Sequence, residues 1–512
     1  MRTRNSILNI ITSVVFTFIV GILSMFRLKY FVGYYGNEVN GFFTLSNSIS
    51  LMITFVEAGM GGIFIQKMYK LLAFDDKESI VNLFYTVKRI GMVITLFIFL
   101  LAFGYSFIHV NQYQYLFGPA LTILVYWLYM LPTVISYYLR IPAYVLMADQ
   151  KEYIVSFFGQ LGNVISYLIQ IILLLRFKNL NIIVISLVMF VFSLLPLVIN
   201  YWIALHKYSY LRHKPAHVVF DKDVLVKMKD CLMASVSNSI MQSVDTIMLA
   251  YCSVQSNIFR LSLISVISIY NGVILLVKNI LNGFVSQVIA SFGNVMHTDR
   301  KNFNFLYSAY IKISFVICTA IFACVFGAIN KFNLIFYNMG DKLLPFTFVL
   351  VIVVNAVLDV IKIPLIAAPV NINGDYKFQR NLMAFEAFAN VVLSYVLLMT
   401  IGEIGLFLAT LIVQLISVGI VLPIKCYQII ERKYKDFFKE FCFYALMFIF
   451  LCYVNVNLIE VITIRSIITL FIAAGLLACI NISLLVFLSL LKYEDFRIVV
   501  DDLVTKLYRG VA

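Results

Sequence analysis

Four long stretches of the sequence contain no charged side chain, and they constrain the fold more than any other feature. They span residues 5–26, 153–175, 404–424 and 466–491. A helix needs about 20 apolar residues to cross the hydrocarbon core of a bilayer, so each stretch is long enough for one crossing. The whole chain is 62% hydrophobic and only 12% charged, whereas an average soluble domain is about 25% charged. A water-soluble protein is therefore excluded.

The same criterion, applied along the whole chain, predicts about fourteen transmembrane helices. A transmembrane β-barrel is excluded, because its strands would be short and would alternate apolar with polar residues. The amino-terminal apolar run has no cleavage site of small residues behind it, so we interpret it as an uncleaved first helix. The predicted fold class is an all-α polytopic membrane protein with spans near 7–26, 41–65, 90–108, 116–139, 153–175, 181–203, 231–252, 261–291, 305–329, 343–361, 382–401, 404–424, 441–457 and 466–491.

The positions of Lys and Arg predict the orientation in the membrane, because positively charged loops stay in the cytoplasm. When the loops of a fourteen-span topology are assigned alternately to two sides, one side holds 29 of the 39 Lys and Arg residues and the other side holds 8. The basic side includes both termini, which are therefore predicted to be cytoplasmic. The net charge of +14 follows from this bias, and no nucleic-acid partner is needed to explain it.

The loops divide the chain and limit the chemistry that it can perform. The longest loop, residues 206–230, separates an amino-terminal lobe of six spans (1–205) from a second lobe of six spans (231–424). Residues 425–512 add two further spans and a tail. Two lobes around a central cavity are a common transporter design. No P-loop pattern is present and no loop approaches the size of a soluble domain, so we expect a transporter, not an enzyme, with no cofactor and no metal.

Three segments resemble a known family of transporters. They are residues 26–62, 238–250 and 373–412. They resemble the Wzx-type flippases of O-antigen and capsular polysaccharide repeat units, which belong to the polysaccharide transporter family of the MATE/MOP exporter superfamily. The residues that carry the resemblance are Gly36, Glu38, Gly41, Leu45, Glu57 and Gly59 in the first segment, Asp245 in the second, and Gly374, Tyr376, Lys377, Glu386, Asn390, Gly402 and Gly405 in the third.

The resemblance implies a flippase of the bacterial inner membrane. Such a protein moves undecaprenyl-diphosphate-linked oligosaccharide repeat units, the precursors of O-antigen or capsule, across the bilayer by ion-coupled alternating access. Its partners would be that lipid-linked oligosaccharide, the lipid bilayer, and the polysaccharide polymerase with its chain-length machinery. The physical problem fits the predicted architecture, because a charged sugar head group cannot cross about 30 Å of hydrocarbon unaided.

Charged residues within or beside the spans are the candidate site residues, because a charge near the bilayer centre normally faces a cavity or a partner. The cations would hold the diphosphate, and the carboxylates would bind a coupling ion. Glu57, Lys278 and Asp359 are predicted to lie at roughly similar depth. Alternatively, Lys278 pairs with Glu57 or Asp359, or Asp359 pairs with Lys362, so that the charges neutralise each other between helices, and the two arginines extend to the membrane interface. The substrate-binding candidates are Arg27, Arg260, Lys278 and Lys362, and the ion-coupling candidates are Glu57, Asp245, Asp359 and Glu386.

Two other functions remain as alternatives. A cation-coupled multidrug efflux antiporter of the same superfamily would usually have twelve spans and an anionic cavity, whereas this sequence predicts an extra pair of spans and mixed charges. A membrane-embedded glycan polymerase would need a long external loop, and the predicted external loops are short.

Overall fold

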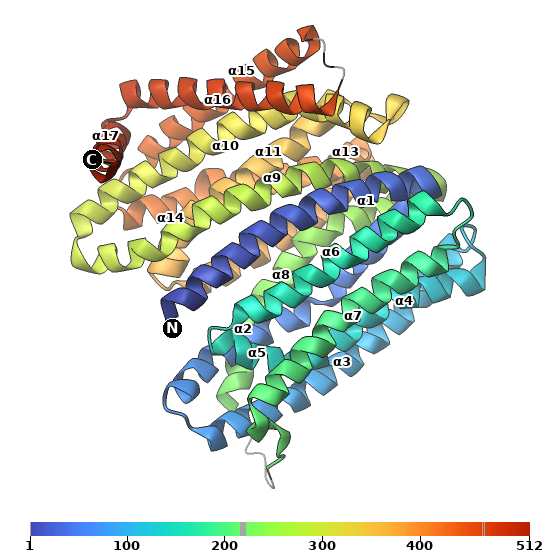
Figure 1. Cartoon of the computed structure of the whole chain (residues 1–512). Helices are drawn as coiled ribbons and strands as arrows, with labels where there is room; N and C mark the ends of the chain where they lie inside the picture. Colours follow the sequence, from blue (N-terminus) through green and yellow to red (C-terminus); the bar gives the residue numbers. More distant parts are fainter. Residues whose placement is uncertain (1, 216–221, 463, 465, 512) are drawn as a thin grey trace. The chain divides into compact units, whose positions relative to one another are not determined.

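The computed structural model describes residues 2–215, 222–462, 464 and 466–511, and within these residues all regular secondary structure is helical (Figure 1). The short 3-10 turns are η1 (Ser209–Arg212) and η2 (Gly340–Lys342), and the π-helical segments are η3 (Ala367–Ile372) and η4 (Ser417–Val421). The α-helices are α1 (Arg2–Ile53), α2 (Phe55–Ala73), α3 (Lys77–Tyr113), α4 (Pro119–Leu139), α5 (Ile141–Ala148), α6 (Glu152–Arg176), α7 (Ile182–Lys207), α8 (Lys222–Cys252), α9 (Asn257–Thr298), α10 (Arg300–Tyr337), α11 (Phe346–Ile366), α12 (Tyr376–Ile401), α13 (Ile404–Ile416), α14 (Leu422–Ile429), α15 (Tyr434–Val461), α16 (Ile467–Lys492) and α17 (Glu494–Val511).

Twelve segments among the described residues are long and apolar enough to cross a membrane. The two further predicted spans are residues 41–65, which run from the end of α1 into α2, and residues 231–252, which lie in α8. The all-α prediction is thus confirmed, and the number of spans agrees roughly with the sequence. Most helices extend beyond the predicted apolar windows, because a helix does not have to end where the hydrocarbon ends.

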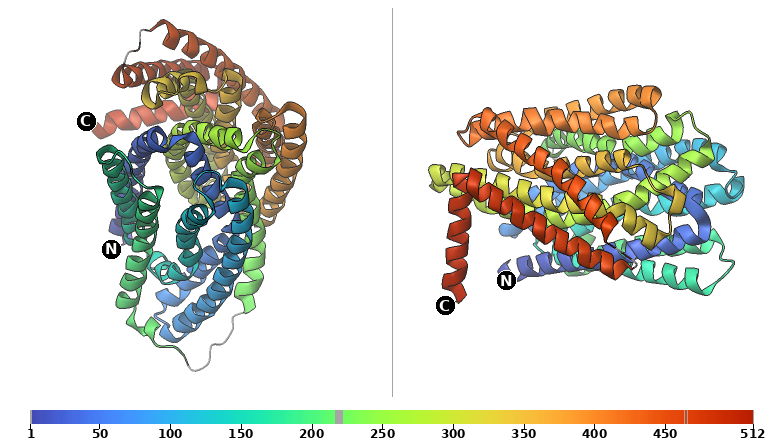
Figure 2. Two further views of the ribbon diagram at one scale, coloured as in Figure 1. Left: turned by 90° about the vertical axis from the view of Figure 1, so that its right-hand side faces the viewer. Right: turned by 90° about the horizontal axis from the view of Figure 1, so that it is seen from above.

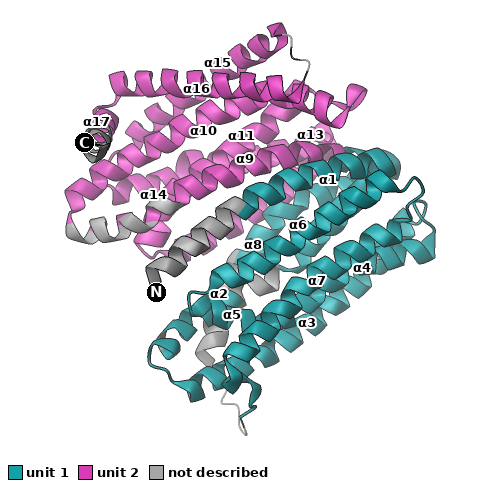
Figure 3. Cartoon of the chain, viewed as in Figure 1, with its two compact units in different colours: residues 1–265 teal, residues 266–512 magenta. Residues whose placement is uncertain are grey.

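The chain forms two compact units, residues 1–265 and 266–512, which Figure 3 shows in different colours. The boundary lies within α9, whereas the sequence places the division between its predicted lobes at residues 206–230. Unit 1 therefore contains α8 and the beginning of α9 in addition to the six spans of the predicted amino-terminal lobe.

Within unit 1, α6 packs along α1 and α7, and α7 packs along α4. Helix α8 packs against both α1 and α2. Within unit 2, the largely buried helix α10 contacts α11, α15, α16 and α17. Helix α13 lies between α11 and α12, and the right-hand view of Figure 2 shows α17 at a steep angle to α16.

The first connection differs from the sequence prediction, which leaves residues 27–40 as a loop. Helix continues on both sides of Gly36, and this residue alone has a non-helical backbone, with φ 85° and ψ 172°. A positive φ is accessible to glycine because it has no Cβ atom. The connection between the first two spans is therefore one residue, and Arg27 lies inside a helix.

A second difference is α5, in a segment that the sequence assigns to a cytoplasmic loop. Seven of its eight residues are buried, and it packs against α2 and α7. Its sequence, IPAYVLMA, is apolar throughout, but it is too short for a membrane span. A search for apolar stretches of membrane-spanning length therefore does not detect a helix this short.

Candidate functional site

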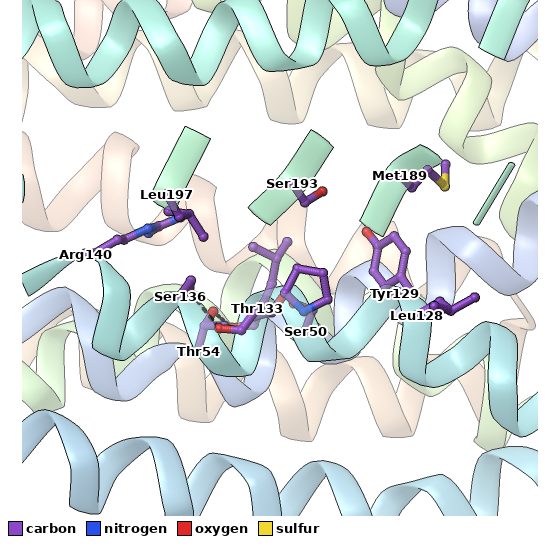
Figure 4. A pocket seen from close by; sticks show the side chains of 12 residues that line it. Ser50, Thr54, Leu128, Tyr129, Thr133, Ser136, Arg140, Met189, Ser193 and Leu197 are labelled. Atoms are coloured by element: carbon purple, nitrogen blue, oxygen red, sulfur yellow. Dashed lines mark hydrogen bonds between the residues drawn. The ribbon is translucent and has the colours of Figure 1, made fainter. Parts of the chain in front are cut away.

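Unit 1 contains a cavity of about 370 Å³ between α1, α4 and α7 (Figure 4). Most of its lining side chains are polar, which is unusual in the middle of a membrane-spanning bundle and indicates a hydrated interior. The lining residues are Ser50 and Leu51 of α1, Thr54 directly after it, Leu128, Tyr129, Pro132, Thr133 and Ser136 of α4, Arg140 at the end of α4, and Met189, Ser193 and Leu197 of α7.

Hydrogen bonds between α1 and α4 and within α4 hold hydroxyl groups of this cavity in place. Ser50 Oγ donates to Thr133 Oγ1 at 3.1 Å, and Ser136 Oγ donates to the Thr133 carbonyl at 2.6 Å. Proline has no N–H group, so Pro132 leaves the Leu128 carbonyl without its usual helical partner. A hydroxyl that donates within the protein keeps lone pairs that can accept from a ligand. The cavity therefore offers a wall of acceptors to a ligand rich in hydroxyl groups.

Two arginines lie at opposite ends of the cavity. Arg140 is exposed, and Figure 4 shows it at one end, with Tyr129 and Met189 at the other. Arg27 approaches that second end, since its Nη2 atom lies 3.8 Å from the Met189 sulfur. A polar cavity between two guanidinium groups is suited to an anionic ligand with hydroxyl groups.

Arg27 faces the inside of unit 1. Its Nε donates to Gln170 Oε1 at 2.8 Å, and its guanidinium lies 4.4 Å from the centre of the Phe31 ring. Gln170 is itself fixed by a hydrogen bond to Ser166 Oγ at 2.9 Å. The positive charge is thus held by a neutral amide and an aromatic ring, which leaves it able to attract an anion.

In unit 2 the candidate charges form two ion pairs. Lys278 Nζ of α9 lies 2.8 Å from Asp359 Oδ2 of α11, and Gln414 of α13 donates to the other Asp359 oxygen at 2.7 Å. The side chains of Lys278 and Asp359 are 25% and 36% exposed, so this pair is only partly buried within the protein. The sequence left Glu57 and Asp359 as alternative partners for Lys278, and the structure pairs Lys278 with Asp359.

The second pair joins α11 to α12. Lys362 Nζ lies 2.7 Å and 2.6 Å from the two carboxylate oxygens of Glu386, whose side chain is only 2% exposed. Ser417, the first residue of the π-helical segment η4, also donates to Glu386. Lys362 therefore pairs with Glu386, not with Asp359 as the sequence suggested. π-Helical segments often occur at functional sites, and η4 contributes directly to this pair.

Two further candidates, Arg260 and Asp245, are described away from the cavity lining and the two pairs. Arg260 lies in the first turn of α9 and donates to the Ala250 carbonyl at 3.1 Å and also to the Ser253 carbonyl. It therefore holds the turn between α8 and α9, where a cation also interacts favourably with the helix dipole. Asp245 is half-buried in α8. The side chain of Glu57 lies outside the described residues.

Sequence reasoning passed over the hydroxyl groups of the cavity, Arg140, Gln170 and Gln414. One signal was available, because Thr133 and Ser136 follow Pro132 inside an otherwise apolar span. Among the described residues, no three His, Cys, Asp or Glu side chains gather as metal ligands would. The sequence places His213 and His217 four positions apart, but no Cys or carboxylate completes a metal-binding spacing, and His217 lies outside the described residues.

The fold defines a class of membrane protein. No protein-family model and no curated protein sequence matches this chain. Solved structures do match, and those reported below are transporters or flippases built from the same bundle of helices. The chain therefore has the fold of the MOP superfamily, as the sequence predicts, and it is a multi-pass membrane protein.

Three structures illustrate the likeness. The lipid II flippase MurJ in an inward closed conformation has a TM-score of 0.67 and 18% identity, over 93% of this chain and 98% of MurJ. An inward-facing MATE family multidrug resistance transporter has a TM-score of 0.62 and 14% identity, over 80% of this chain and 95% of that protein. An outward-facing MATE family transporter has a TM-score of 0.55 and 14% identity, over 83% and 97% of the two chains.

Proposed function

We propose that this protein is a flippase for undecaprenyl-diphosphate-linked oligosaccharide repeat units in the bacterial inner membrane, with both termini in the cytoplasm. The extent of the likeness to MurJ carries the proposal. Helix α14 ends at residue 429 of 512, so a match that covers 93% of the chain must extend into α15–α17. The two MATE transporters match 80% and 83% of the chain. The longer match to MurJ, which includes residues beyond α14, supports a lipid-linked cargo in this proposal.

The cavity in unit 1 fits part of such a cargo. Ligand-binding cavities are commonly about 300–1,000 Å³, and the volume of about 370 Å³ suits one sugar with an adjacent phosphate better than a whole repeat unit. The hydroxyl wall would accept hydrogen bonds from the sugar, while Arg27 and Arg140 would attract the phosphate from the two ends. Arg260 would add positive charge at the outer end of the same unit.

The two ion pairs of unit 2 would couple the cycle to an ion. While Asp359 is charged it neutralises Lys278, and Glu386 does the same for Lys362. A proton or cation that neutralises the carboxylate would release the lysine to attract the diphosphate. Asp359, Glu386, Asp245 and Glu57 are accordingly the proposed ion-coupling residues, and Lys278 and Lys362 are proposed to bind substrate.

Deletion of the gene tests the function directly. We expect long surface glycan to disappear while lipid-linked single repeat units accumulate on the inner leaflet, with little change in resistance to dyes and cationic drugs. Normal glycan together with lost drug resistance would identify an efflux transporter instead, the function to which the likeness to MATE transporters points.

A filled cavity tests the proposed site. Thr133→Leu places a larger apolar side chain among the hydroxyl groups and should lower surface glycan per molecule of membrane-inserted protein by about tenfold or more, the loss expected when several polar contacts to a ligand are removed. Thr400→Leu makes the same change at an exposed position of α12 and should leave the glycan unchanged. Equal glycan in the two variants at equal expression would remove the cavity from the mechanism.

A further inference from the structure

A buried histidine of unit 1 has no role in the function proposed above. His109 lies near the end of α3 that the charge bias predicts to be external, and its side chain is fully buried. The predicted spans 90–108 and 116–139 leave His109 in the connection between them. In the structure α3 continues through His109 to Tyr113, so the imidazole is part of a helix–helix contact.

The contact around His109 joins α1 and α3 to α8 and the beginning of α9, which the sequence assigns to the second lobe. Asn40 of α1 donates to Ser265 Oγ of α9 at 2.9 Å, and Ser265 donates to Asn37 Oδ1 at 3.0 Å. A Cβ atom on Gly41 would lie 2.0 Å from the Leu261 carbonyl oxygen, so the two backbones are in direct contact. We call Asn37, Asn40, Gly41, His109, Tyr251, Arg260 and Ser265 the outer clamp; all of them belong to unit 1.

The hydrogen bonds around His109 specify which ring nitrogen is protonated. Ser46 Oγ donates to the Phe42 carbonyl at 2.8 Å, so at 3.4 Å from His109 Nε2 it can only accept, and Nε2 carries the proton. Nδ1 of the neutral ring then accepts from the Tyr251 hydroxyl, also at 3.4 Å. Tyr251 is hydrogen-bonded to Tyr105 as well, so Tyr105 donates to Tyr251.

A proton on Nδ1 would reverse this arrangement. The ring would become a donor at both nitrogens, and Tyr251 would have to accept from Nδ1 and donate to Tyr105. Both original bonds are long at 3.4 Å, so they hold the neutral state weakly. A single proton therefore reorganises the contact between α3 and α8.

Uncharged side chains surround His109 in the closed clamp. The facing side chains are Phe42 and Ser46 of α1, Tyr105 and Tyr113 of α3, Tyr126 of α4 and Tyr251 of α8. Tyr113 and Arg260 both donate to the Ala250 carbonyl, at 3.4 Å and 3.1 Å, which places the guanidinium just beyond the Tyr113 ring. Glu38 acts electrostatically on Tyr115, one ring further out. Among the described residues, no carboxylate contacts the imidazole.

We propose that His109 is a proton-binding site that controls the outer clamp: a proton bound at Nδ1 from the external side opens the contact of α1 and α3 with α8 and α9. Histidine is the side chain whose charge normally changes between about pH 5 and pH 8. A proton that binds the open, hydrated site more tightly than the closed one must shift the equilibrium towards the open clamp. The proposal rests on the proposed function only in that a transport cycle uses such a gate.

The test measures clamp opening without any substrate. In a variant whose native cysteines are replaced by Ala, Ser265→Cys reports the clamp through its reaction with a membrane-impermeant maleimide in right-side-out vesicles. Val254→Cys, at an outer-turn position that is 87% exposed, corrects for the pH dependence of the maleimide reaction itself. We expect the ratio of the two labelling rates to rise about tenfold from pH 8 to pH 5.5.

Two substitutions assign the effect to His109. His109→Gln can still donate to Ser46 and accept from Tyr251 but cannot take up a proton, so its labelling ratio should stay low at every pH. His109→Lys carries a fixed positive charge and should be labelled rapidly at every pH. His206→Gln, an exposed histidine in the last turn of α7, should behave like the parent.

Two results overturn the proposal: a labelling ratio of the parent that does not change with pH, or a pH dependence that persists in His109→Gln. Neither result depends on His109→Lys, a variant that could fail to fold. A pH-dependent clamp in a protein whose deletion leaves surface glycan intact would refute the flippase and retain the proton site. The flippase and the proton site of the outer clamp can therefore be refuted independently of each other.

Discussion

The pair formed by Lys362 and Glu386 allows a sharp test of how the buried charges of unit 2 are stabilised. Lys362→Met removes the cation and keeps much of the apolar volume of the side chain. Glu386 is then left with the Ser417 hydroxyl as its donor among the described residues, although its side chain is 2% exposed. Loss of one partner from a buried ion pair typically costs about 3–5 kcal/mol, because the remaining charge is uncompensated.

The change should be measured as the free energy of unfolding by SDS in mixed micelles. We expect Lys362→Met to lose about 3–5 kcal/mol and the double variant Lys362→Met/Glu386→Gln to recover most of it, since the neutral amide needs no counter-ion. The matched control is Lys77→Met. Lys77 and Asp75 form a pair at 3.6 Å with side chains 60% and 79% exposed, so this control should lose less than about 1 kcal/mol.

The reasoning is refuted if Lys362→Met is as stable as the parent, because the carboxylate would then have found another cation or enough water. A double variant no more stable than the single one would also contradict it. In that case the lysine would be needed for its packing against neighbouring helices, not for its charge.

The remaining predictions concern topology, helix contact and pH. Reporter fusions after residues 75, 220, 299 and 505 should report the cytoplasm and a fusion near Asn111 the exterior, and an external signal at 220 would contradict the two-lobe topology. Gly41→Ala should lower thermal stability by about 1–3 kcal/mol because its Cβ would lie 2.0 Å from the Leu261 carbonyl oxygen, whereas Gly33→Ala has open space and should not. Burial raises the pKa of Asp495, but Lys312, Ser308 and Arg432 outweigh it and hold that pKa below its usual value. The stability from Asp495 is therefore present above the unfolded pKa of about 3.9 and is lost as the pH falls through the lower folded value. Proteolysis of α17 should accelerate at that acidic pH in the parent, and in Asp495→Asn it should be equally fast at neutral pH.

The helices could be predicted from the sequence because the bilayer imposes a length and a composition on each span. The run 153–175 lies within α6, and the run 466–491 nearly coincides with α16; each bound differs from that of its helix by only one residue. Helices that obey other requirements were not predicted: α5 is buried but short, and α17 carries charges at its ends and middle. The one-residue connection at Gly36 depends on a backbone angle that hydropathy does not report.

The partners of the charged residues could be predicted only in part, because depth in the membrane follows from position along a span while rotation about the helix axis does not. Lys278, Glu57 and Asp359 were expected at similar depth, and the structure pairs Lys278 with Asp359. Asp359 was an alternative partner for Lys362, yet Lys362 reaches across to Glu386. The choice depends on which face of α11 meets α9, α12 and α13. A single sequence contains too little information to determine that.

The same geometry separates the two kinds of cation in this protein. The described contacts of Arg27 and Arg260 are an amide, a thioether, an aromatic ring and backbone carbonyls, all of them neutral. The described partners of Lys278 and Lys362 are carboxylates. A charge held by neutral groups remains attractive to an anion, whereas a lysine in an ion pair becomes so only when its carboxylate is neutralised. If the proposed function holds, we expect the arginines of unit 1 to attract an anionic head group at all times, and the lysines of unit 2 to attract it only when an ion neutralises their carboxylates. Arg27→Gln should accordingly weaken substrate binding at every pH, while Asp359→Asn should strengthen it and remove its dependence on the coupling ion. Binding of a labelled lipid-linked diphosphate sugar to the purified protein measures both, and equal ion dependence in Asp359→Asn and the parent would show that Lys278 is not switched in this way.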